Sequence, residues 1–236
     1  MSAHDGKATQ MLEPGIHRDR QIQQNIMREF EYDPHIGDVE IGIQVHTGQV
    51  TLSGMVETYA LKIAAQEAAH RCQGVLDVAN DIVVSVRHEH PVTDPEIAEA
   101  VRRALEWDEL VQSDHIHTTV TDGWVVLHGD VPSLLDKTFA EYAVHTIKGV
   151  RGVANSLEVV SLPIAREDVK RNIVSALERQ ADLHAGNIFV EVRDGIVVLS
   201  GCVSDWQERR EVLHAASRAR GVHRVEDRLR IDPNAP

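Results

Sequence analysis

Hydrophobic positions follow the same order of periodicities three times along the chain. In the first passage they recur at helical spacing, in Ile22, Ile26 and Phe30, and then alternate with polar residues over 41–45 and 50–52. An alanine-rich helical stretch over 65–72 and a third alternating run complete the unit. A period of 3.6 residues indicates an amphipathic helix, whereas strict alternation indicates a half-buried strand. The pattern predicts α-β-β-α-β in each passage, with the first two strands joined as an antiparallel hairpin.

A glycine-bounded motif marks the second strand of every passage and fixes the register of the repeat. It reads Gly48-Gln-Val-Thr-Leu-Ser-Gly54, Gly123-Trp-Val-Val-Leu-His-Gly129 and Gly195-Ile-Val-Val-Leu-Ser-Gly201. The copies are therefore offset by 75 and 72 residues without internal gaps. A fixed period of this kind identifies a tandem array. We expect an N-terminal tail (1–16), three domains (17–87, 93–162 and 165–232) and a C-terminal tail (233–236).

This order of elements and three short motifs resemble the BON domain (bacterial OsmY and nodulation). The motifs are G-x-V-x-L-x-G, G-V-x-x-V and N-x-[IL]-x-V, the last two beginning at Gly74 and Asn80 in the first copy. The resemblance implies an α+β fold of three tandem domains, each a three-stranded sheet with two helices on one face. It also implies a binding protein without catalytic residues, with a role in phospholipid or surface binding under osmotic or envelope stress.

Candidate chemistry is sparse, which agrees with a non-enzymatic protein. No phosphate-binding glycine loop, nucleophile elbow or zinc-ligand spacing occurs in the sequence. The two cysteines, Cys72 and Cys202, have no metal or disulfide spacing and are interpreted as free thiols. His115, His117 and His128 could come together on one sheet face, but their sister positions carry no metal ligands. We therefore expect no catalytic residue, metal or cofactor. Asn80, Asn155 and Asp227 share one position, where we expect a side chain that bonds the local backbone.

The alternation also predicts which side chains leave the core. If Val50 and Leu52 and their sisters face the helices, the second and third copies present apolar residues on the opposite sheet face. These residues are Trp124, Val126, Phe189, Ile196 and Val198. An exposed apolar patch usually marks a contact surface. Packing between the second and third copies is the alternative to a partner.

Charge is distributed unevenly over a chain of net charge −13. Residues 88–162 contain 13 acidic and five basic residues, whereas residues 163–236 contain 12 of each. Arginines concentrate in the last helix and strand of the third copy. From this cluster we predict a lipid- or partner-binding site of Arg209, Arg210, Arg218, Arg220 and Trp206. So acidic a chain is a poor nucleic-acid binder.

Three functions remain open at this level. The arginines and Trp206 could bind an anionic phospholipid surface, each arginine contributing about 1 kcal/mol. The basic third copy could instead bind the acidic second copy of another chain, and a contact between unlike patches closes into rings or continues as filaments. A sensor of potassium or calcium is a third hypothesis, suggested by the acidic loop Trp107-Asp108-Glu109 together with Asp114. The N-terminus has no signal-peptide pattern and no apolar run could span a bilayer, so we expect a cytoplasmic protein.

Overall fold

The computed structural model describes residues 14–37, 39–85, 92–160, 166–179 and 188–232. The first domain comprises α1 (Pro14–Tyr32), β1 (Ile41–His46), β2 (Gln49–Val56), α2 (Tyr59–His70) and β3 (Asp77–Val84). The second comprises α3 (Asp94–Trp107), the 3-10 turn η1 (Ser113–His115), β4 (Ile116–Thr121), β5 (Trp124–Val131), α4 (Leu134–His145) and β6 (Gly152–Val159). The third comprises α5 (Arg166–Arg179), β7 (Ile188–Arg193), β8 (Ile196–Val203), α6 (Trp206–Ser217) and β9 (Arg224–Ile231). Most of the predicted N-terminal tail and the whole C-terminal tail lie outside the described residues.

Each domain combines one three-stranded sheet with two α-helices, which confirms the predicted α+β class. In all three sheets the second strand is central, antiparallel to the first and parallel to the third. The crossover between the parallel strands is the second helix of the domain. The alternation also places the core as expected, because Val125 and Leu127 are fully buried, as are Val197 and Leu199.

The glycines of the repeated motif are needed for backbone geometry. Gly48 and its two sisters end hairpin turns with positive φ angles between 75° and 80°. Gly129 has φ 121°, and a Cβ atom there would collide with the carbonyl oxygen of His115. The cap of α2 is Arg71, and Gly74 lies in the following turn at φ 91°, packed against Ile22 of α1.

An aspartate of the first helix accepts hydrogen bonds from the hairpin turn in two of the three domains. Both carboxylate oxygens of Asp19 accept backbone hydrogen bonds, from Thr47 and Gly48, at 2.7 and 3.0 Å. Asp94 repeats the arrangement in the second domain, at 2.8 and 2.9 Å. The same offset leads to Arg166 in the third domain, which cannot accept these bonds. The third domain therefore shares the fold but not this contact.

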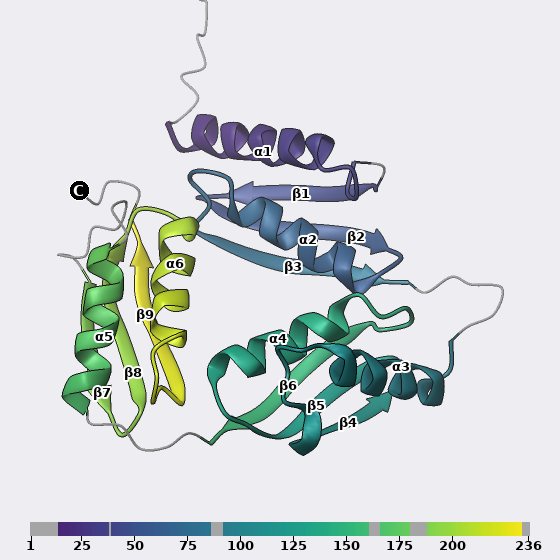
Figure 1. Cartoon of the computed structure of the whole chain (residues 1–236). Helices are drawn as coiled ribbons and strands as arrows, with labels where there is room; N and C mark the ends of the chain where they lie inside the picture. The colour runs from purple at the N-terminus through teal and green to yellow at the C-terminus, as the bar shows by residue number, and fades with distance from the viewer. Residues whose placement is uncertain (1–13, 38, 86–91, 161–165, 180–187, 233–236) are drawn as a thin grey trace, which may run out of the picture.

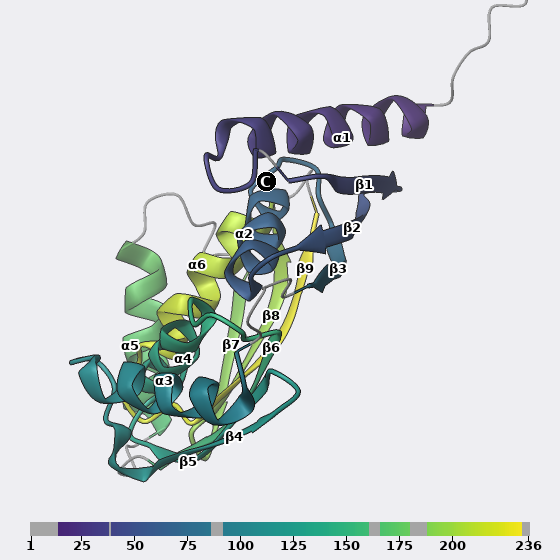
Figure 2. The ribbon, with the colours of Figure 1, turned by 90° about the vertical axis from the view of Figure 1, so that its right-hand side faces the viewer.

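The three domains contact one another in a closed cycle. Figure 1 shows α2, α4 and α6 near the middle of the molecule, and Figure 2, a quarter turn away, shows the same helices beside one another. Tyr59, Leu134 and Trp206 are the first residues of these helices and occupy equivalent positions. Each packs against the core of the next domain: Tyr59 against the second, Leu134 against the third and Trp206 against the first.

Aromatic contacts strengthen two of these three joints. The Tyr59 ring meets His145, at the end of α4, edge to face with centroids 5.1 Å apart. Trp206 stacks on His70, at the end of α2, with centroids 4.0 Å apart and an interplanar angle of 22°. The arrangement is a pseudo-threefold ring within one chain, built from one helix position and its sisters. No helix within the described ranges is both long enough and apolar enough to cross a bilayer.

Candidate functional site

The structure separates the predicted arginine cluster into residues with different environments. Arg209 lies inside the domain, where its Nε atom donates to Asp227 at 2.7 Å and both side chains are less than a quarter exposed. Its guanidinium also lies over the Trp206 ring, 4.5 Å from the centroid. Arg209 therefore stabilises α6 against β9 rather than facing a ligand, which corrects its predicted place in an exposed site.

The sister domains show why Arg209 is structural. Asn80 accepts from the backbone of Ile82 and donates to the carbonyl of Lys62 on α2, as the local backbone bond predicted for it requires. Lys62 in turn donates to the carbonyl of Ile82 at 2.7 Å. Asn155 and Lys137 repeat this pattern in the second domain. In the third domain the lysine and asparagine become Arg209 and Asp227, so a charged pair replaces a set of neutral and charged hydrogen bonds.

Trp206, the aromatic member of the predicted lipid- or partner-binding site, lies between two domains. Its ring is half-buried between α6 and the first domain, stacked on His70. Its indole Nε1 is enclosed and has no hydrogen-bond partner within the part of the chain that the structure describes. The residue joins two domains, so it cannot insert into a lipid surface without opening that joint.

Arg210 projects into the space between the domains. It lines a cavity of about 190 Å³ with His70 and Trp206, and one of about 420 Å³ with Tyr142 and His214. Its positive charge contributes to lowering the pKa of His70, although desolvation by burial is the larger cause of the shift to about 4. Arg210 thus belongs to the surface where the second helices meet.

Arg218 and Arg220 remain accessible and help to form a groove between α5 and α6. The groove has a volume of about 470 Å³, and we call it the arginine groove. Its polar lining is Asn172, Ser175, His214, Arg218 and Arg220, and the other lining residues are three alanines. Among the side chains that the structure describes, every polar one in this lining can donate a hydrogen bond, and none is a carboxylate. Such a lining favours an anion.

His214 gives the arginine groove a titratable group. Its pKa lies below the ordinary value of 6.5, first because burial penalises the charged form and then because Arg218 and Arg210 repel a further positive charge. An anion placed between these groups would reverse the electrostatic contribution and raise the pKa of His214. The groove therefore couples anion binding to protonation.

The predicted sheet surface is exposed as expected, although in two separate parts. The side chains of Trp124 and Phe189 are 56% and 66% exposed, and those of Val126, Ile196 and Val198 are half-buried. Trp124 lies on the second domain, where its ring covers Gly152 on the adjacent parallel strand. Val126 also lies on the second domain, whereas Phe189, Ile196 and Val198 belong to the third. The five residues therefore do not form a single patch. Their role in binding stays a prediction.

The histidines and cysteines do not assemble a metal site in the described part of the chain. The rings of His117 and His128 lie across neighbouring strands with centroids 5.8 Å apart, but His115 lies in η1 instead of on the strand. No group of three potential ligands occurs among the described residues. Neither cysteine forms a disulfide, and burial raises the pKa of the Cys72 thiol to about 11.

Sequence reasoning identified two residues of the arginine groove and missed three. Asn172 and Ser175 come from α5, whose packing against α6 is a tertiary contact that spacing does not reveal. His214 could have been found, because it precedes Arg218 by four positions and therefore shares a helix face with it. The informative feature is that no described acidic side chain lines the groove, and only the structure shows it.

Comparisons with known proteins agree with the repeat and the fold. The family model of the BON domain matches residues 18–85, 93–161 and 165–233. The osmotically-inducible protein Y of Escherichia coli (strain K12) is 30% identical over 128 residues, which cover 52% of this chain and 64% of that protein. The match therefore spans slightly less than two thirds of the relative's length.

Solved structures of low similarity include CdsD, a structural protein of the Type III secretion system of Chlamydia trachomatis. Its C-terminal domain is 16% identical, with coverage of 89% of this chain and 96% of that one and a TM-score of 0.27. A second CdsD structure is 15% identical, with coverage of 89% and 91% and a TM-score of 0.24. The three family matches, the three sheets and the common register show that this chain belongs to the BON domain family.

Proposed function

We propose that this chain is a non-enzymatic binding protein of osmotic or envelope stress that recognises phosphate groups of an anionic phospholipid surface. One observation carries the proposal: the described side chains that line the arginine groove are all donors or apolar, in a chain of net charge −13. The family membership and the similarity to an osmotically inducible protein support the stress association.

The chemistry of the groove suits a phosphate group. The guanidinium groups of Arg218 and Arg220 can each present two parallel N–H donors to phosphate oxygens. Asn172 and Ser175 can supply uncharged donors from the opposite helix. Because residues 163–236 are neutral overall, the third domain meets less repulsion from an anionic surface than the second domain would.

Flotation with lipid vesicles tests this function. Wild-type protein is expected to float with phosphatidylglycerol vesicles and not with phosphatidylcholine vesicles. The double variant Arg218→Gln/Arg220→Gln should bind phosphatidylglycerol about 30-fold more weakly, because each arginine near the surface contributes about 1 kcal/mol.

A matched control separates the arginine groove from net charge. Arg224→Gln/Arg230→Gln removes the same charge from exposed positions of β9, outside the groove. This variant should bind almost as well as the wild type. Equal losses in the two double variants, or no flotation of the wild type with either vesicle, would refute binding through the groove.

Self-association in the cytoplasm is a second candidate, favoured by the exposed Trp124 and Phe189 and by the acidic second and neutral third domains. It predicts particles whose light scattering falls as salt screens the charges. A monodisperse monomer at low salt and high protein concentration would contradict this candidate.

A further inference from the structure

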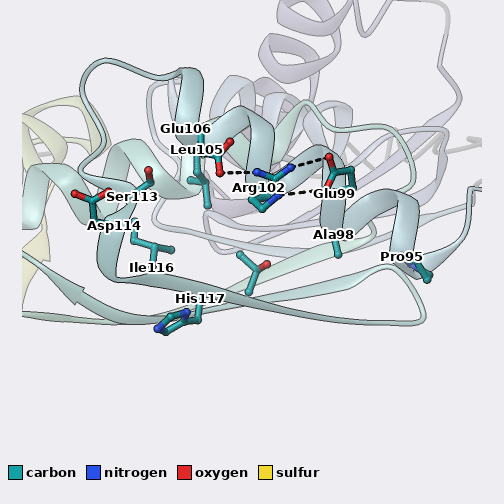
Figure 3. Close-up of a pocket in the computed structure, with 11 residues that line it drawn as sticks. Pro95, Ala98, Glu99, Arg102, Leu105, Glu106, Ser113, Asp114, Ile116 and His117 are labelled. Carbon is teal, nitrogen blue, oxygen red and sulfur yellow. Dashed lines mark hydrogen bonds and ion pairs between the residues drawn. The ribbon is translucent and has the colours of Figure 1, made fainter.

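A second groove, in the middle domain, has a different chemistry from the arginine groove. It lies between α3 and the edge strand β4, with a volume of about 660 Å³ (Figure 3). Leu105 and Ile116 contribute apolar surface, and Ser113 and Asp114 of η1 close one end. Because β4 pairs only with β5 in this sheet, its outer edge is not used by another described strand.

Comparison with the first domain shows why this groove is open. There, Gln23 of α1 reaches the edge strand β1 and donates from Nε2 to the carbonyl of Ile43 at 2.8 Å. The residues at the same positions in the second domain are Ala98 and Thr118, and both line the groove. Alanine has no donor, and no other described side chain donates to the Thr118 carbonyl. The second domain therefore lacks the contact that covers this edge in the first.

The backbone of β4 presents unpaired hydrogen-bonding groups toward the groove. In an antiparallel edge strand, the N–H and C=O groups of alternate residues point away from the neighbouring strand. The hydrogen bond to Ile43 shows that the backbone carbonyl of this residue points away from β2. By the common register, the backbone N–H and C=O groups of Ile116, Thr118 and Val120 point away from β5. An extended chain laid along this edge could pair with them as a fourth strand.

Charge along the helical wall of the groove specifies the partner further. Arg102 is held between two carboxylates, at 2.7 Å from Glu99 and 2.6 Å from Glu106, as the dashed lines in Figure 3 show. With Asp114 included, the lining has three acidic side chains and one arginine. The surrounding segment, 88–162, carries a net charge of −8. A basic occupant is therefore favoured over a neutral or acidic one.

We propose that this groove binds an extended polypeptide segment with basic side chains at alternate positions, which adds to the edge of β4. Main-chain hydrogen bonds to β4 hold the segment, and its basic side chains face Glu99, Glu106 and Asp114. This inference is independent of phospholipid binding, because the arginine groove is in another domain.

A fluorescent peptide of alternating lysine and valine, six residues long, tests the proposal with the full chain. Fluorescence anisotropy should report saturable binding with a Kd below about 1 mM, which corresponds to a binding free energy of roughly −4 kcal/mol. Replacing the lysines by glutamates, or methylating alternate backbone nitrogens, should each weaken binding at least about ten-fold, because charge complementarity or edge hydrogen bonding is lost.

Ala98→Gln supplies the decisive variant, since it introduces the residue that covers the edge in the first domain. Binding of the lysine peptide should be lost, whereas the control Ala100→Gln, the same substitution on the same helix but outside the groove lining, should retain it. The proposal fails if the lysine peptide does not bind up to about 1 mM, or if methylation or Ala98→Gln leaves binding unchanged. A dimer of the wild type that Ala98→Gln abolishes would assign the edge to a second copy and also overturn the proposal.

Discussion

Replacing Trp206 by alanine is expected to open the ring of domains at the contact between the third and first domains. The half-buried indole packs against the core of the first domain and stacks on His70. Full burial of a tryptophan is worth about 3–5 kcal/mol against alanine, so a half-buried one should contribute about 2 kcal/mol to the free energy of unfolding. Urea denaturation would measure this loss, and small-angle scattering should show a larger radius of gyration. Trp107→Ala, at a position 85% exposed, provides the matched control.

The same variant has a specific signature in the titration of His70. The pKa of His70 is lowered to about 4, mainly because burial excludes water from the ring. Removing Trp206 should expose the imidazole and move its pKa upward toward 6.5, which NMR can follow at the ring protons. If the pKa stays near 4 in Trp206→Ala, the joint does not depend on this residue.

The sign of the pH dependence follows from the depressed pKa of His70. Between pH 6.5 and about 4, the unfolded chain binds a proton at His70 that the folded ring excludes. Stability of the closed arrangement should therefore fall as the pH decreases through this window. Above pH 6.5 the imidazole is neutral in both states and has no effect.

Replacing Arg209 by alanine is expected to destabilise the third domain by about 2–3 kcal/mol. The substitution leaves the Asp227 carboxylate, only 22% exposed, without the guanidinium that neutralises it. It also removes the cation over the Trp206 ring. Thermal and urea unfolding of the full chain would measure the loss.

The sister domains supply the control for Arg209. The double variant Arg209→Lys/Asp227→Asn introduces the residues that the first and second domains use at these positions. It should lie within about 1 kcal/mol of the wild type, because a set of hydrogen bonds that fits this fold is restored. A double variant as unstable as Arg209→Ala would show that the equivalence of the three networks is wrong.

The sequence was sufficient to predict the elements and the inward and outward faces of each sheet. The reason is that both signals are local. The alternation around Val125 and Leu127 reflects the period of a strand, and the glycines of the motif reflect positive φ angles in the backbone. The three copies also provided internal comparisons, and the exposure of Trp124 and Phe189 follows from the same alternation.

The arginine cluster could not be resolved from the sequence because its members differ only in tertiary contacts. Arg209 and Arg210 are neighbours in the chain, yet one pairs with Asp227 and the other lines spaces between domains. Likewise, the composition of Trp206 and the nearby arginines is typical of a membrane anchor. Only the structure shows that the indole packs against the first domain and stacks on His70 of α2.

A phosphate group bound in the arginine groove should change the titration of His214, which NMR can follow at the ring protons. In the unbound protein the pKa of His214 lies below 6.5 because of desolvation and the charges of Arg218 and Arg210. Phosphatidylglycerol nanodiscs should raise this pKa, and binding should strengthen as the pH falls through it, whereas phosphatidylcholine nanodiscs should leave it unchanged. Binding to phosphatidylglycerol with no shift in the pKa of His214 would contradict the account.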